Sequence, residues 1–122
     1  MDATTRRILT MIPTLTPGWA WMLLLVAGLL EVVWTGALKA SNGFTNPAYT
    51  AVSVLTSIVS FALLGITLKS LPVGTAYAVW TGVGAVGAAV LGMWLFGEAA
   101  TTGRLLCIAL IVVGIAGLKL FP

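Results

Sequence analysis

The chain has 122 residues, of which 60% are hydrophobic and only 7% are charged, and its formal net charge is +3. A soluble domain averages about 25% charged residues, so this composition excludes a water-soluble globular protein and predicts a protein whose solvent is lipid. The Lys and Arg residues form no run and histidine is absent, which argues against nucleic-acid binding and against a metal or cofactor site.

Residues 1–18 precede the first long apolar run, and they contain Arg6 and Arg7 among short apolar pieces broken by prolines. A secretory signal needs an apolar core of about 7–15 residues and a small-residue cleavage site, whereas the run that follows here is longer. We therefore predict a mobile N-terminal tail at residues 1–18 and a membrane domain at residues 19–122. Because Met22 lies within the first apolar run, a start codon at that position is a second interpretation of the tail.

Four segments are apolar and long enough to cross a hydrocarbon core of about 30 Å, which takes about 20 helical residues. They are predicted at about residues 19–38, 48–68, 72–96 and 104–120. Their connections are short, so consecutive helices should be antiparallel neighbours, and an even number of spans places both termini on one side. The expected fold class is an all-α membrane protein with four transmembrane helices per chain.

The first span contains Glu31, the only acidic residue within the four predicted spans. A charged side chain at the centre of a spanning helix costs about 2.5–3.5 kcal/mol on insertion scales, and it normally faces a bundle interior or a water-filled cavity. No basic residue of the chain is predicted at a comparable depth. Glu31 is therefore predicted to hold a proton until a cation replaces it, as in a proton-coupled cation antiporter. A structural hydrogen bond to a neighbouring helix is the alternative.

Three residues flank Glu31 on one helical face, because they lie three or four positions from it: Gly28, Trp34 and Thr35. Gly28 leaves space and Thr35 offers a hydroxyl group. Trp34 offers an indole N–H and a π face that attracts a cation. We expect all three to line the site, although a position in the aromatic belt at the membrane surface is the alternative for Trp34.

The second span carries a stripe of hydroxyl groups at spacings of three and four: Ser53, Thr56, Ser57 and Ser60. Small hydroxyl side chains in membrane helices commonly serve helix packing through close approach and hydrogen bonds. We predict a packing role for this stripe, with Ser60 set apart for the reason given below.

In the third span, Tyr77 and Trp80 are three residues apart and form an aromatic face that can stack on a flat cation. The same segment contains a literal GxGxxG at Gly82, Gly84 and Gly87. A dinucleotide-binding role is excluded because no βαβ unit surrounds it and no acidic residue follows at the required distance. A close-packing point or a flexible point is predicted instead, since glycine lets backbones approach and weakens a helix, and a conformational hinge at Gly82 and Gly84 is one form of it.

The fourth span has a stripe of mostly small residues without an ionisable partner, at Gly103, Cys107, Leu110, Gly114 and Gly117. Such a stripe predicts a helix association surface, here for dimerisation. Oligomerisation is also expected because four closely packed helices leave little room for a substrate path. No second catalytic group lies at membrane depth, so no enzymatic activity is expected.

The segments AGLLEVVWTGALKASNGFT, KSLPVGTAYAVWTGVGAVGAA and GIAGLKL resemble the small multidrug resistance family, and in particular its guanidinium-exporter subtype. The resemblance covers about residues 19–121. The subtype is indicated by Trp34 three residues after Glu31, by YAVWTG and by Lys119 near the end of the last span. The resemblance implies an antiparallel, dual-topology homodimer in the bacterial cytoplasmic membrane, with dimer contacts on the fourth helix.

The resemblance also implies that Glu31 binds proton and substrate in competition. It implies that four residues line the site and hydrogen-bond the glutamate or the substrate: Trp34, Ser60, Tyr77 and Trp80. The expected function is a proton-coupled exporter of guanidinium and small substituted guanidinium ions. Two alternatives stay open: a promiscuous antiporter of quaternary ammonium and aromatic cations, and a subunit of a heterodimeric polyamine exporter or another non-transporting membrane partner.

The positive charges are nearly balanced between the two predicted ends of the helices. Four lie on the side of the termini (Arg6, Arg7, Lys69 and Lys119) and two on the other (Lys39 and Arg104). Lys and Arg normally mark the cytoplasmic side, so this weak difference permits insertion in both orientations. The tail departs from the compact family pattern, and its two arginines shift the balance toward one orientation.

Overall fold

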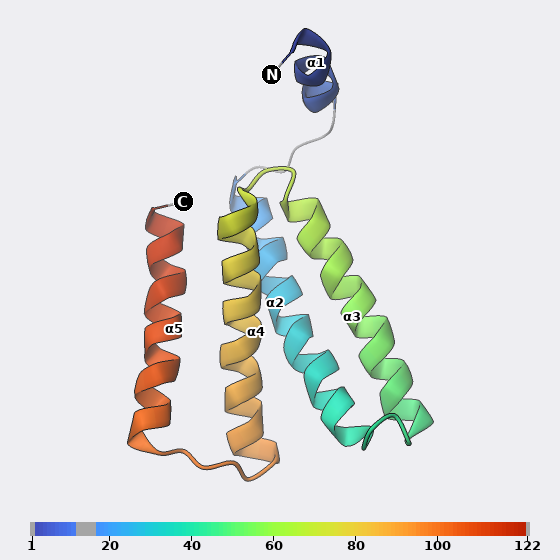
Figure 1. Ribbon diagram of the computed structural model, residues 1–122, viewed down its shortest axis with the longest axis vertical. Helices are drawn as coiled ribbons and strands as arrows, with labels where there is room; N and C mark the ends of the chain where they lie inside the picture. Colours follow the sequence, from blue (N-terminus) through green and yellow to red (C-terminus); the bar gives the residue numbers. More distant parts are fainter. Residues whose placement is uncertain (1, 12–16, 122) are drawn as a thin grey trace.

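The computed structural model describes residues 2–11 and 17–121. Within them the chain forms α1 (Ala3–Met11), α2 (Pro17–Ala40), α3 (Pro47–Thr67), α4 (Val73–Leu95) and α5 (Thr102–Leu120) (Figure 1). The last four helices are long and apolar enough to cross a membrane. The four predicted spans are therefore confirmed.

Helix α1 lies within the predicted tail, where the sequence analysis expected no helix. The carboxylate of Asp2 accepts a hydrogen bond from the backbone N–H of Thr5 at 2.6 Å, so Asp2 caps the start of this helix. Among the described residues, α1 makes no contact with the other four helices. Residues 12–16 lie outside the described residues, and the mobility of the tail stays a prediction.

The turn between α2 and α3 is fixed by local backbone chemistry. Asn42, Gly43 and Phe44 have φ values of 50°, 67° and 66°, so the chain reverses through the left-handed region. The side-chain oxygen of Asn46 then accepts hydrogen bonds from the backbone N–H groups of Ala48 and Tyr49, which caps α3. Pro47 occupies the first turn of α3, where its missing N–H is not needed.

Helix α2 lies at the centre of the chain and packs against both α3 and α4, while α5 packs only against α4 (Figure 1). The buried apolar core is small and consists of Leu24, Leu64, Ala76 and Val79. Helix α5 has no buried residue, and large apolar side chains are exposed along all four long helices. Such a surface requires lipid, a second copy, or both to cover it.

Helices α2 and α4 approach each other along a column of glycines, here called the glycine seam: Gly28 and Gly36 of α2, and Gly84 and Gly87 of α4. A Cβ atom at Gly28 would lie 2.7 Å from the Val83 side chain, and one at Gly36 would lie 2.7 Å from Leu91 Cδ2. At Gly87 an added Cβ would overlap Val32. The seam therefore lets two backbones approach closely, as small residues do in membrane helix pairs.

Candidate functional site

The carboxylate of Glu31 lies against the backbone of Gly84 in α4. A Cβ atom at Gly84 would overlap Oε2 of Glu31 and would lie 2.9 Å from the carboxylate carbon. Gly84 is buried, and α4 is continuously helical from Val73 to Leu95. The structure thus gives Gly84 a role beyond the predicted hinge, which stays a prediction: its missing side chain leaves the space that the Glu31 carboxylate occupies.

Glu31 has no polar partner within the part of the chain that the structure describes. No described side chain donates a hydrogen bond to its carboxylate, and the ion pair found among these residues joins Glu98 to Arg104 instead. The carboxylate is half-buried. A half-buried carboxylate in a membrane helix with no partner in its own chain is free to bind a proton or a cation.

Ser60 connects three helices through its hydroxyl group. The buried hydroxyl donates to the backbone carbonyl of Ala27 in α2 at 2.6 Å. It also accepts a hydrogen bond from Nε1 of Trp80 in α4 at 3.0 Å. Ser60 therefore fixes the Trp80 indole, and in this conformation its polar contacts are with Ala27 and Trp80 rather than with Glu31.

Trp34 and Trp80 line the same groove, of about 420 Å³, on the side of α3. The ring of Tyr77 packs against that of Trp80, with centroids 5.6 Å apart and planes inclined by 47°. Tyr77 is 55% exposed, so its ring lies on the surface of the single chain. The structure thus brings the three predicted aromatic residues close to one another, with Ser60 behind Trp80.

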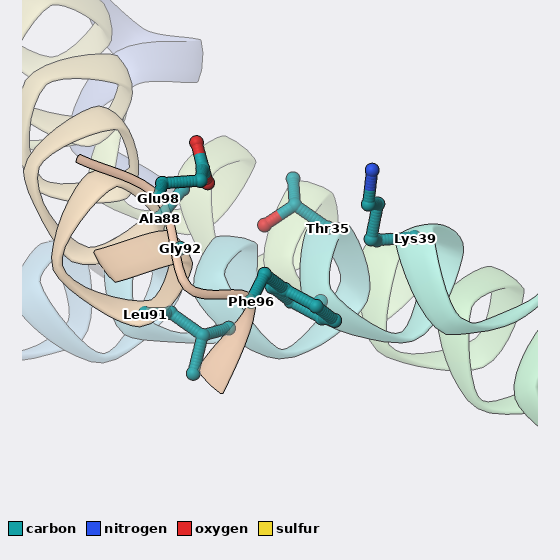
Figure 2. Close-up of a pocket in the computed structure, with 8 residues that line it drawn as sticks. Thr35, Lys39, Ala88, Leu91, Gly92, Phe96 and Glu98 are labelled. Atoms are coloured by element: carbon teal, nitrogen blue, oxygen red, sulfur yellow. The ribbon is translucent and has the colours of Figure 1, made fainter. Parts of the chain in front are cut away.

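Gly28 and Thr35 lie away from this aromatic groove. Gly28 is buried against Val83 in the glycine seam, so it serves packing in this conformation. The Thr35 hydroxyl donates to the backbone carbonyl of Glu31 at 2.7 Å. Thr35 lines a second groove of about 320 Å³, in which Thr35 and Lys39 of α2 face Glu98 (Figure 2).

Of the three residues of the α3 hydroxyl stripe with a predicted packing role, only Ser53 bonds another helix. The Ser53 hydroxyl donates to the backbone carbonyl of Trp34 at 2.8 Å. Ser53 and Ser60 therefore both form hydrogen bonds from α3 to α2. Thr56 and Ser57 instead donate to carbonyls of their own helix. Two interhelical hydrogen bonds, seven residues apart, therefore fix the register between α2 and α3.

The predicted dimer stripe of α5 is uncovered within the single chain. An added Cβ at Gly103, Gly114 or Gly117 would meet no atom within 4 Å. Cys107 is exposed and Leu110 is 71% exposed. These five residues are therefore available for contact with lipid or a second copy, and their dimer role stays a prediction.

Four further residues line the aromatic groove from α3: Ser57, Ile58, Phe61 and Ala62. Ser57 was predicted to serve packing, and no role was predicted for the other three. The spacing of four residues between Ser57 and Phe61, and between Ile58 and Ala62, marks one face of α3. That face could be recognised in the sequence, but its position opposite Trp34 depends on the register between α2 and α3.

Comparison with known proteins gives a consistent result over most of the chain. The family model for small multidrug resistance proteins matches residues 19–111. A guanidinium exporter of Escherichia coli strain K12 is 57% identical over 101 residues, which are 83% of this chain and 96% of that protein. Guanidinium exporters of Citrobacter freundii and Salmonella typhimurium are each 55% identical over the same shares.

Proposed function

This chain belongs to the small multidrug resistance family, and from that premise we propose that it is a proton-coupled antiporter exporting guanidinium and small substituted guanidinium ions. It is a multi-pass transporter of the bacterial cytoplasmic membrane. The observation that carries the proposal is the Glu31 carboxylate, which lies against Gly84 without a polar partner among the described residues. Its relatives are named exporters, and we propose no enzymatic activity.

Guanidinium matches the chemistry of Glu31 and of the aromatic residues that are predicted to line the same site. Its N–H donors form a planar fork that fits the two oxygens of a carboxylate, whereas a quaternary ammonium has no N–H to donate. Its flat face can stack on an aromatic ring, and Trp34 and Trp80 present such rings in one groove. The Ser60 hydroxyl restricts rotation of the Trp80 indole. Charge, planarity and donor geometry together favour a guanidinium-type cation.

Exchange of protons for the cation supplies the coupling. In a homodimer, two Glu31 carboxylates would share one central site and titrate as a pair. Cation binding on one side of the membrane releases protons from the pair. Protonation on the other side then expels the cation. Transport requires alternating access: the loaded site must open first to one side of the membrane and then to the other. Our hypothesis places that rearrangement near Gly82 and Gly84.

Two features support a homodimer with copies inserted in opposite orientations. The α5 stripe is uncovered within the single chain, and α5 packs only against α4 among the described elements. The positive charges differ little between the two ends of the helices. A protein with such a balance can insert either way, so the two orientations needed for an antiparallel pair are both available.

The function is tested by substrate-driven proton flux in proteoliposomes that contain only this purified chain. We expect an inward guanidinium gradient to drive outward proton movement, and we expect tetraphenylphosphonium, which is bulky and has no N–H, to drive little. Proteoliposomes that contain the Glu31→Gln variant are the negative control.

Three results would contradict the proposal in different ways. Equal flux with tetraphenylphosphonium indicates a promiscuous multidrug antiporter. The absence of flux with either cation indicates a chain that needs a different partner subunit. Guanidinium uptake without proton movement indicates a uniporter rather than an antiporter.

A further inference from the structure

A groove of about 520 Å³ lies at the end of the molecule opposite the α2–α3 turn and is separate from the Glu31 site. Three helices form it. Its principal lining residues are Trp21, Met22 and Leu25 of α2, Val83 of α4, and Ile115 and Lys119 of α5.

Among the described residues, the groove exists because the backbones of α2 and α5 do not approach each other, although the Lys119 side chain reaches the Trp21 ring. Both helices pack against α4, which forms the floor between them (Figure 1). The walls are apolar, so water gains little by entering. In a bilayer the gap is open to lipid, and a flexible acyl chain of a membrane lipid can fill it.

One cation lies at the mouth of this apolar groove. The ammonium group of Lys119 is 5.8 Å from the centre of the Trp21 ring. No acidic side chain of the described residues forms an ion pair with Lys119. Lys119 is in the last turn of α5, and Trp and Lys are typical residues of the membrane–water interface. A positive group here is complementary to a lipid phosphate.

The depth of the groove corresponds to one leaflet. Its lining on α2 runs from Gly18 to Leu25, which is about 10 Å along a helix at 1.5 Å per residue. Half of a hydrocarbon core is about 15 Å thick. The groove therefore begins at the interface and ends before the bilayer midplane, as a site for part of one acyl chain requires.

We propose that this groove binds one anionic phospholipid, with the phosphate at Lys119 and an acyl chain between α2 and α5. The lipid then fills the gap between two helices whose backbones do not approach each other. This inference is independent of the transported cation, because none of its residues belongs to the proposed substrate site.

The test is native mass spectrometry of the detergent-solubilised protein with equal amounts of phosphatidylglycerol and phosphatidylcholine. We expect retained lipid to be mainly phosphatidylglycerol, up to one per chain. Lys119→Gln should reduce the retained phosphatidylglycerol about tenfold, the factor that corresponds to losing one charge-assisted contact. Ala116→Phe should also reduce it, by filling the groove while keeping Lys119.

Lys69→Gln is the matched control, because Lys69 lies on the same side of the membrane domain but does not line the groove. It should retain phosphatidylglycerol as the unchanged protein does, and inorganic phosphate should not displace the lipid. An equal loss in Lys69→Gln would mean general attraction to anionic lipid and overturn the proposal. Displacement of the lipid by phosphate would also overturn the proposal. So would an Ala116→Phe protein that no longer dimerises but still retains lipid, because the groove would then be a contact site for a second copy of the chain.

Discussion

Glu31 and Glu98 both place a carboxylate against a glycine of α4, but only Glu98 has a cation beside it. An added Cβ at Gly84 would overlap Glu31, and one at Gly92 would overlap Glu98, so the two contacts are built alike. Arg104 forms an ion pair with the Glu98 carboxylate, in which its Nη2 lies 3.1 Å from Oε1 of Glu98. Glu31 has no ion pair with the described residues.

The guanidinium group of Arg104 shows how this chain itself holds such a cation. It donates to the Glu98 carboxylate and, through Nη1, to the backbone carbonyl of Ala99 at 3.3 Å. Glu98 is in a connection between helices and its side chain is 46% exposed. The difference is that the exposed carboxylate has a cation partner within the chain, whereas the carboxylate in the span has none among the described residues, as the proposed binding of an external cation requires.

The largest expected effect separates these two carboxylates directly. Glu31→Gln should abolish guanidinium-driven proton flux, because the amide neither ionises nor exchanges a proton, while the protein still folds and dimerises. Glu98→Gln should keep flux within about threefold, since an exposed ion pair contributes little. Flux assays and size-exclusion chromatography of both variants provide the measurement. Similar losses in both variants would show that the two carboxylates do not differ in role.

A second variant tests whether glycine is needed beneath Glu31. Gly84→Ala should raise the KM for guanidinium about ten- to hundredfold, the equivalent of one displaced charge-assisted hydrogen bond. Gly82→Ala is the control, because its Cβ would meet side-chain atoms of Ile115 and Ile111, the nearest being Ile115 Cδ1 at 2.9 Å, and not the Glu31 carboxylate. The shorter carboxylate of Glu31→Asp should partly restore binding in the Gly84→Ala background.

The same pair of variants distinguishes this role from the predicted hinge. If helix flexibility is what matters, Gly82→Ala should impair transport as much as Gly84→Ala, and Glu31→Asp should not rescue either one. Measurement of KM and kcat for each variant decides between the two interpretations.

A third prediction concerns the serine that holds Trp80. Ser60→Ala removes two buried hydrogen bonds and should weaken guanidinium binding about tenfold, because the indole is no longer fixed. Ser53→Ala removes only the bond to the Trp34 carbonyl, so it should lower thermal stability without a comparable loss of affinity. Equal effects on affinity would assign Ser60 to helix packing alone.

Trp34→Gly should alter selectivity more than rate. Trp34 forms the α2 wall of the aromatic groove, and its removal enlarges the groove toward α2. We expect larger aromatic cations to be transported better relative to guanidinium, by about five- to tenfold, the lower end of the about 1–3 kcal/mol that one apolar contact contributes to discrimination. Competition assays with a series of substituted guanidinium ions would measure this, and unchanged selectivity would place Trp34 outside the substrate path.

The smallest effect is expected for substitution of Arg104, the ion-pair partner of Glu98. Arg104→Gln breaks the ion pair with Glu98, and at this exposure the cost in stability should be below about 1 kcal/mol. Chemical denaturation in detergent is the measurement, and a larger loss would mean that the connection before α5 helps to hold the fold.

The sequence predicted the four spans because their apolar length is a local property, and the observed helices begin and end within about two residues of the expected positions. It also identified Glu31, since a charge within an apolar run is visible without any neighbour. It could not place Glu31 on Gly84, because that contact depends on the register between α2 and α4. The role of Ser60 came only from family resemblance, as nothing in its own stripe distinguishes it from Ser53.

The two serine hydrogen bonds join α2 to α3, and α5 packs only on α4, so the membrane domain consists of two helix pairs that meet mainly along the glycine seam. Movement of one pair against the other is then a shear along that seam. The Glu31–Gly84 contact lies within it. Any such shear would change the surroundings of the carboxylate. In the mechanism that we propose, cation binding at Glu31 and displacement of the helices would therefore be linked through this one contact.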